Sequence, residues 1–98
     1  NWEASSYNTE AMVEAFKSND TSTIKKYVNG RIKAKMKNGM TQDNAVFGIR
    51  TSITNMYKEK YIKGNADEKA KIITIMTKTG VYGSRTDVIS YIKKYWLK

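Results

Sequence analysis

The chain has 98 residues, the length of one small domain or of one piece of a longer protein. Hydrophobic residues make up 40% and charged residues 28%, proportions that favour a folded domain over a disordered segment. The absence of cysteine and histidine excludes disulfides, thiolate and imidazole catalysis, and Cys/His zinc sites. Apolar runs reach only two or three residues, so we expect neither a membrane span nor a signal peptide.

The formal net charge of +9 is unevenly distributed along the chain. Residues 1–20 carry four acids and one lysine, whereas residues 21–98 carry seventeen lysines or arginines against five acids. A basic body of this kind attracts polyanions such as nucleic acid, acidic protein surfaces or anionic membranes. Only three of the cations are arginines, and arginine is the usual residue for bidentate recognition of bases. Any nucleic-acid binding is therefore expected to be non-specific.

Glycine and asparagine interrupt the chain at intervals that predict five helices, and the absence of proline suits them. The predicted helices cover residues 9–18, 21–38, 42–63, 66–79 and 85–98. Asn8, Asn65 and Ser84 are the expected N-caps, with Asp87 completing a capping box at Ser84. Gly39 and Gly80 are expected to stop the helices that precede them. Residues 71–75 have strand propensity, but their apolar residues recur at helical spacing, so a helix is expected there.

These elements predict an all-α fold, a small irregular bundle of about five helices that forms a single domain over residues 1–98. A faint internal duplication leaves another arrangement open, in which two overlapping three-helix units share the helix over residues 42–63. Because the first residue is Asn1 rather than Met, we expect the chain to be a fragment of a longer polypeptide. The expected core consists of Phe16, Ile24, Val28, Ile32, Val46, Ile49, Ile53, Tyr57, Ile72, Ile73, Met76, Val88, Ile92 and Trp96.

The carboxylates offer no catalytic arrangement. Glu10 and Glu14 share a helical face that has the composition of solvated surface, and Asp67 and Glu68 lie where a helix N-terminus attracts negative charge. The sequence contains no phosphate-binding loop, no nucleophile motif and no run of metal ligands. We therefore predict a non-enzymatic protein without catalytic, cofactor-binding or metal-binding residues.

Arg50 interrupts the apolar face of the helix predicted over residues 42–63. It lies seven residues before Tyr57 on that face, and a buried guanidinium without a partner is costly. One interpretation is intramolecular, with a salt bridge to Asp20, Asp43 or Asp87, or hydrogen bonds to carbonyls at a helix C-terminus. The other interpretation is contact with an anionic partner.

The helix predicted over residues 21–38 carries a lysine stripe. Lys26, Lys33 and Lys37 lie opposite its apolar arc, whereas Arg31 and Lys35 lie within the span of that arc. A lysine stripe is usually a solvated face; the alternative is a ridge that follows phosphates and whose affinity falls steeply with salt. The candidate anion-binding or nucleic-acid-binding residues are Lys26, Arg31, Lys33, Lys35, Lys37, Arg50, Lys58 and Lys60.

Tyrosines alternate with lysines in residues 57–61 and in residues 91–96. Each segment places two tyrosines one helical turn apart. Such arrays stack the bases of single strands in some proteins, although tyrosines at helical spacing also pack at core edges. A helix-turn-helix over residues 66–98 is disfavoured, because the connector is long and the exposed side of the last helix has few base-reading residues.

The residues at the helix ends and in the connectors between them resemble those of a known group of proteins. Residues 57–65 read Tyr-Lys-Glu-Lys-Tyr-Ile-Lys-Gly-Asn, and residues 79–84 read Thr-Gly-Val-Tyr-Gly-Ser before a final helix that ends in Trp-Leu-Lys. This succession resembles the C-terminal regions of large proteins encoded by bacteriophages of Gram-positive bacteria, with Val81 replacing the usual Leu and Asn65 replacing Asp. Residues 17–21 and 49–54 are similar to the first half of the same module. The resemblance implies a helical module of a phage structural or internal protein, and it brings no functional residues with it.

Two functions remain as the main hypotheses; a third, an anti-host inhibitor that mimics a partner surface, is disfavoured by the positive charge, because such phage proteins are more often acidic. The leading one is a non-enzymatic interaction or structural module of a phage-encoded protein, which docks onto another protein or onto another part of its own polypeptide. The alternative is a non-specific nucleic-acid-binding helical domain. Neither requires a cofactor, and the expected locations are the phage particle or the bacterial cytoplasm.

Overall fold

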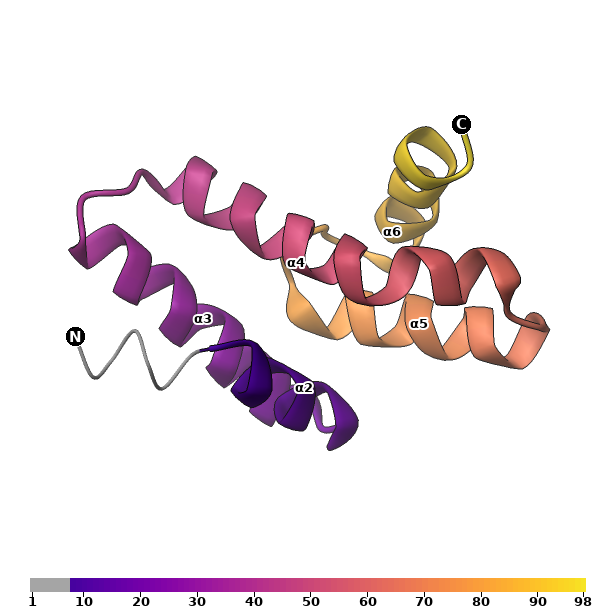
Figure 1. Cartoon of the computed structure of the whole chain (residues 1–98), viewed down its shortest axis with the longest axis horizontal. Helices are drawn as coiled ribbons and strands as arrows, with labels where there is room; N and C mark the ends of the chain where they lie inside the picture. Colours follow the sequence, from indigo (N-terminus) through magenta and orange to yellow (C-terminus); the bar gives the residue numbers. More distant parts are fainter. Residues whose placement is uncertain (1–7) are drawn as a thin grey trace. The chain divides into compact units, whose positions relative to one another are not determined.

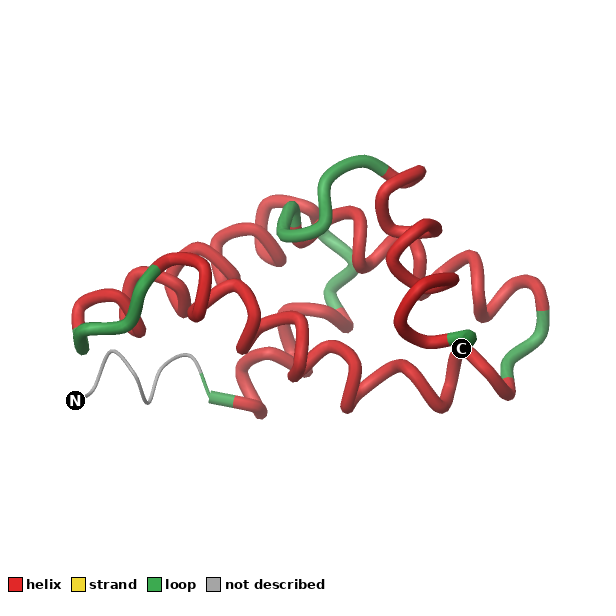
Figure 2. The backbone as a smooth tube through the Cα atoms, turned by 90° about the horizontal axis from the view of Figure 1, so that it is seen from above, coloured by secondary structure: helices red, strands yellow, loops and turns green. Residues whose placement is uncertain are grey.

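The architecture is helical throughout the part of the chain that the structure describes. A computed structural model describes residues 8–98, and no strand occurs among them. Its elements are α2 (Thr9–Lys17), α3 (Thr21–Lys37), α4 (Gln42–Lys63), α5 (Ala66–Thr79) and α6 (Arg85–Tyr91), which continues into the π-helical turn η1 (Ile92–Trp96) (Figure 1). Short loops join these helices (Figure 2). The predicted all-α fold of about five helices is therefore confirmed.

Capping residues begin the helices where the sequence predicts. The Asn8 Oδ1 atom accepts a hydrogen bond from the Ala11 amide at 3.0 Å. Asn65 accepts from the Glu68 amide at 2.9 Å, and the Glu68 carboxylate accepts from the Asn65 amide at 3.2 Å, which forms a reciprocal capping box. All five predicted starting residues are confirmed, whereas α2 and α3 end one residue earlier than predicted and the last helical turn ends at Trp96.

A second capping box begins α6. The Ser84 Oγ atom accepts from the Asp87 amide at 3.3 Å, and the Asp87 carboxylate accepts from the Ser84 amide at 2.8 Å. The hydrogen bonds from the Ser84 backbone and then its side chain lower the pKa of the Asp87 carboxyl. Gly83 precedes this box with φ of +104°, and a β-carbon there would collide with the Asp87 carboxylate. The predicted box is thus confirmed, and its geometry requires glycine at position 83.

Gly83→Ala is expected to destabilise the protein more than Gly39→Ala does. Gly39 has a similar φ of +99°, but nothing lies within 4 Å of its would-be β-carbon. Gly39→Ala therefore reports backbone strain alone, on the order of 1–3 kcal/mol, whereas Gly83→Ala also displaces the Asp87 cap, which contributes about 1 kcal/mol. Urea unfolding followed by circular dichroism measures both variants. Equal losses would show that the capping contact at Asp87 contributes nothing.

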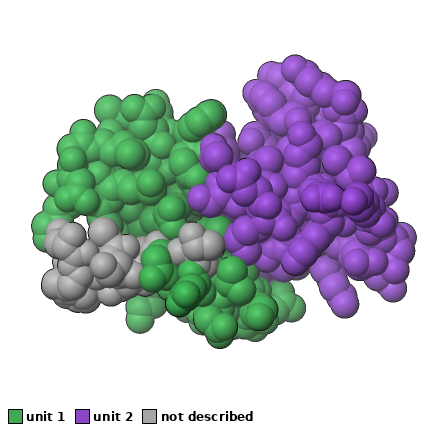
Figure 3. Space-filling view, viewed as in Figure 1, with its two compact units in different colours: residues 1–49 green, residues 50–98 purple. Residues whose placement is uncertain are grey.

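The chain divides into two compact units, Asn1–Ile49 and Arg50–Lys98, and the boundary falls within α4 (Figure 3). The first unit is built from α2, α3 and the start of α4, and the second from the rest of α4, α5, α6 and η1. Buried apolar residues among those described in the first unit are Met12, Ala15, Phe16, Ile24, Tyr27, Val28, Ala34, Ala45 and Ile49. Those in the second unit are Ile53, Ile72, Ile73, Met76, Val88, Ile92 and Trp96.

The predicted core is largely confirmed but wrong at its edges. Ile32, Val46 and Tyr57 are half-buried, because each lies beside the centre of its helix's buried face rather than on it. The small residues Ala34 and Ala45 are buried instead. A short side chain lets the backbones of neighbouring helices approach, and hydrophobicity alone does not identify such positions.

Candidate functional site

The helix α3 separates apolar and cationic residues on opposite faces. Asp20 begins the helix by accepting hydrogen bonds from the Thr23 amide at 3.1 Å and the Thr23 hydroxyl at 2.7 Å. Its inner face buries Ile24, Tyr27, Val28 and Ala34. On the opposite face lie three exposed lysines, which we call the α3 lysine face: Lys26, Lys33 and Lys37. The predicted stripe is therefore confirmed as a solvent-facing surface.

The charge of α3 is not balanced within the helix. Residues 21–37 include six lysines or arginines and no acid. Lys33 and Lys37 are four residues apart, as are Arg31 and Lys35, and like charges at this spacing destabilise a helix by roughly 0.2–0.5 kcal/mol per pair. The α3 lysine face extends over about 16 Å at 1.5 Å per residue. It is thus a line of positive charge of the kind that attracts polyanions.

Arg31 and Lys35 face the interior of the first unit rather than the lysine face. The Arg31 Nη1 atom donates to the Tyr27 hydroxyl at 2.8 Å, and that hydroxyl donates to the Asn8 carbonyl at 3.1 Å. Burial raises the pKa of Tyr27, and the adjacent Arg31 opposes this shift. Lys35 passes over Gly48, where a β-carbon would lie 3.5 Å from the Lys35 Nζ atom. Both predicted candidates therefore contact their own unit.

Arg50 belongs to the second unit, where it holds the connector between α5 and α6. Its Nε atom donates to the Val81 carbonyl at 3.0 Å, and its Nη2 atom donates to the same oxygen. The guanidinium carbon also lies 5.3 Å from the centre of the Tyr82 ring and 5.8 Å from that of Tyr91. Of the intramolecular partners considered from sequence, the structure provides a carbonyl just beyond a helix C-terminus. Asp87 instead caps α6.

Three tyrosines, which we call the tyrosine row, continue from Arg50 to the surface: Tyr82, Tyr91 and Tyr95. Ring centres lie 4.7 Å apart between Tyr82 and Tyr91 and 4.6 Å apart between Tyr91 and Tyr95. The Tyr82 hydroxyl is buried and has no hydrogen-bond partner among the described residues. Burial raises the pKa of Tyr82, and electrostatic repulsion from Tyr91 raises it further. The charge of Arg50 acts in the opposite direction and lowers this pKa. The row therefore runs from a buried, neutral phenol to Tyr95, which is 50% exposed.

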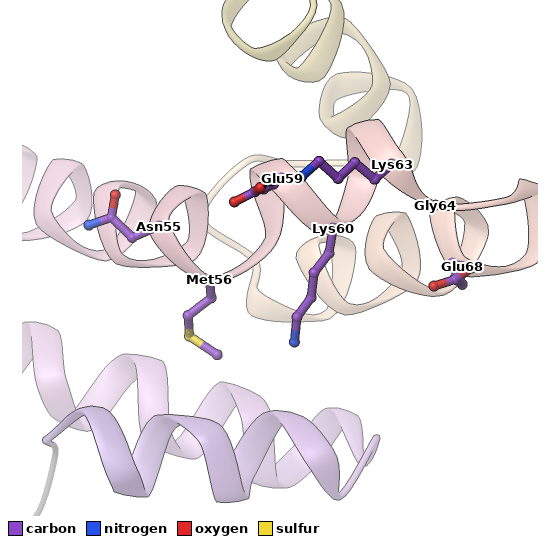
Figure 4. Close-up of a pocket in the computed structure, with 7 residues that line it drawn as sticks. All are labelled: Asn55, Met56, Glu59, Lys60, Lys63, Gly64 and Glu68. Carbon is purple, nitrogen blue, oxygen red and sulfur yellow. Dashed lines mark hydrogen bonds and ion pairs between the residues drawn. The ribbon is translucent and has the colours of Figure 1, made fainter.

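Lys58 and Lys60 do not form a common surface. They lie two residues apart on α4, a spacing that points side chains to different sides of a helix. Lys60 contributes to an open hollow of about 500 Å³ at the α4–α5 corner, whose lining is completed by Asn55, Met56, Glu59, Lys63, Gly64 and Glu68 (Figure 4). Within it, Lys63 pairs with Glu59 at 2.6 Å and Glu68 caps α5. Lys63, Glu59 and Glu68 therefore stabilise the end of α4 and the start of α5.

The candidates thus fall into separate places. The α3 lysine face belongs to the first unit, whereas Arg50, Lys58 and Lys60 lie on α4 in the second. The sequence offered a carbonyl at a helix C-terminus as one partner of Arg50 but did not identify Val81, because a backbone carbonyl in a connector carries no residue-specific signal.

Residues 8–98 contain no group of three or more acidic side chains placed to hold a metal ion. None of their helices is long and apolar enough to span a membrane. Comparisons with protein-family models, with curated proteins and with solved structures found no match to this chain.

Proposed function

We propose that the chain is a non-enzymatic interaction module and that its α3 lysine face binds the phosphate backbone of nucleic acid. The proposal rests on the distribution of charge on α3. The solvent face of α3 presents Lys26, Lys33 and Lys37, while the helix contains no acid that would neutralise them. A solvent face that presents cations on a helix without acids attracts an external polyanion.

Lysine chemistry defines the kind of binding. Each ammonium is a point charge on a flexible stem, and it neutralises a phosphate without reading the neighbouring base. A line of lysines about 16 Å long spans several phosphates of a nucleic-acid strand, whose charges lie about 3.4 Å apart along the duplex axis. The proposed binding is therefore independent of base sequence and sensitive to salt.

The proposal also concerns the biological setting. The resemblance of residues 57–65 and 79–84 to phage-encoded proteins supports a place for this module within a phage structural or internal protein. Docking onto another protein is the second candidate function, supported by large apolar side chains that α3, the α3–α4 loop and α4 leave exposed. These are Met36, Met40 and Phe47, of which Phe47 is 70% exposed.

Fluorescence anisotropy with labelled duplexes of unrelated sequence tests the proposal. We expect binding at about 50 mM salt that weakens by roughly 40-fold at about 200 mM, because neutralising about three phosphates gives a slope near −2.7 in log affinity against log salt. Two duplexes of different sequence should bind equally. Absence of binding at the lower salt concentration would reject nucleic acid as the ligand and leave protein docking as the better candidate.

A further inference from the structure

The exposed end of the tyrosine row leaves a large aromatic ring half in solvent. Ile92 and Trp96 anchor η1 with exposures of 1% and 3%, whereas Tyr95 between them remains 50% exposed. Tyr91 supports the Tyr95 ring from within the unit, with the ring planes inclined at 41°. A large aromatic ring held in place by a second ring, with half its surface in solvent, is a ready stacking surface.

The charge around Tyr95 is positive. The Lys94 ammonium lies over the Tyr95 ring, 5.3 Å from its centre, so a stacking base would displace this exposed, flexible side chain toward the phosphates. Residues 88–98 include three lysines and no acid, and Lys93, Lys94 and Lys98 are all exposed. An exposed aromatic ring with one ammonium beside it, on a basic stretch of chain, matches a ligand that carries a planar ring and a negative charge on each repeating unit, which describes single-stranded nucleic acid.

We infer that Tyr95, supported by Tyr91 and flanked by Lys94, is a stacking site for an unpaired base of single-stranded nucleic acid. This inference rests on the proposed function for its ligand class, but it uses a different surface. The α3 lysine face belongs to the first unit and contacts only phosphates, whereas Tyr95 belongs to the second unit. A base paired in a duplex is already stacked on its neighbours, so Tyr95 gives a preference for unpaired strands.

The test compares the full chain with Tyr95→Leu and Tyr95→Phe. Anisotropy measures their binding to an oligothymidine of about fifteen nucleotides, to an abasic strand of the same length, and to a duplex. The wild type is expected to bind the oligothymidine more tightly than the abasic strand. Tyr95→Leu should weaken oligothymidine binding roughly 5- to 100-fold and remove that difference, while Tyr95→Phe, which keeps the ring, should bind as the wild type does.

The outcomes separate this inference from the proposed function. Equal binding of the oligothymidine and the abasic strand by the wild type would overturn the stacking site. Undiminished oligothymidine binding by Tyr95→Leu would overturn it as well. In both cases, duplex binding would still support the role of the α3 lysine face. If Tyr95→Leu weakened duplex binding as strongly as oligothymidine binding, the ring would have a structural role, and the inference would be wrong.

Discussion

Trp96→Ala is expected to lower the free energy of unfolding by about 3–5 kcal/mol. The indole is only 3% exposed, its Nε1 atom donates to the Thr54 hydroxyl at 3.1 Å, and its ring meets that of Tyr61 edge-on with centres 6.0 Å apart. Trp96 thereby joins the last helical turn to α4. A domain of this size is stabilised by only about 5–15 kcal/mol in total, so the substitution removes a large share.

Urea unfolding monitored by circular dichroism is the appropriate measurement, because the substitution removes a tryptophan and alters fluorescence. Two further variants separate the contribution of the buried ring from that of the indole hydrogen bond. Trp96→Phe keeps most of the buried ring and is expected to lose less than Trp96→Ala. Thr54→Val leaves the indole N–H without its acceptor and is expected to cost about 1–3 kcal/mol. A Trp96→Ala variant within about 1 kcal/mol of the wild type would contradict the anchoring role of this residue.

Arg50→Met is expected to lower the free energy of unfolding by about 2–4 kcal/mol. The substitution keeps the apolar length of the side chain but removes both donors to the Val81 carbonyl. Hydrogen bonds from a charged group contribute about 1.5–3 kcal/mol, and each cation–π contact about 0.5–1 kcal/mol. Arg50→Lys keeps the charge, but its single ammonium cannot reproduce the planar fork, so it should recover only part of the loss.

A double-mutant cycle of Arg50→Met with Tyr82→Leu isolates the contact between guanidinium and ring. The expected coupling is about 0.5–1 kcal/mol. The same variants decide between the two interpretations of Arg50 that the sequence leaves open. If Arg50 chiefly served an anionic partner, Arg50→Met would leave the stability unchanged and weaken ligand binding. The structure predicts the reverse, namely lost stability and unchanged duplex binding.

The helices were predictable because their signals are local. Asn8, Asn65 and Ser84 accept from amides three residues ahead, and such caps are readable from sequence. Gly39 and Gly80 both have positive φ, which explains why each follows the end of a helix. The π-helical turn at Ile92–Trp96 has no comparable local signal, and the sequence predicted an ordinary helix there.

The candidate site was predictable only in part. The α3 lysine face follows from helical periodicity alone, so the spacing of Lys26, Lys33 and Lys37 was sufficient. The partner of Arg50 depends on the path of the α5–α6 connector, which brings the Val81 carbonyl to α4 across 31 residues of sequence. Arg31 was expected beside anions, yet Tyr27 four residues earlier receives its hydrogen bond. That spacing was visible in the sequence and could have suggested the pair.

The claim that the α3 lysine face binds nucleic acid is tested most directly by two variants of equal net charge. One carries Lys26→Gln, Lys33→Gln and Lys37→Gln; the other carries Lys17→Gln, Lys63→Gln and Lys71→Gln, which replace exposed lysines outside both proposed binding surfaces. Glutamine has nearly the helix propensity of lysine, so the folds should be retained. The measurement is the slope of log affinity for duplex DNA against log salt concentration. We predict that the slope decreases in magnitude by about 2.7 in the α3 variant and by less than about 1 in the control. Equal slopes in the two variants would contradict the proposal, because binding would then depend on net charge alone.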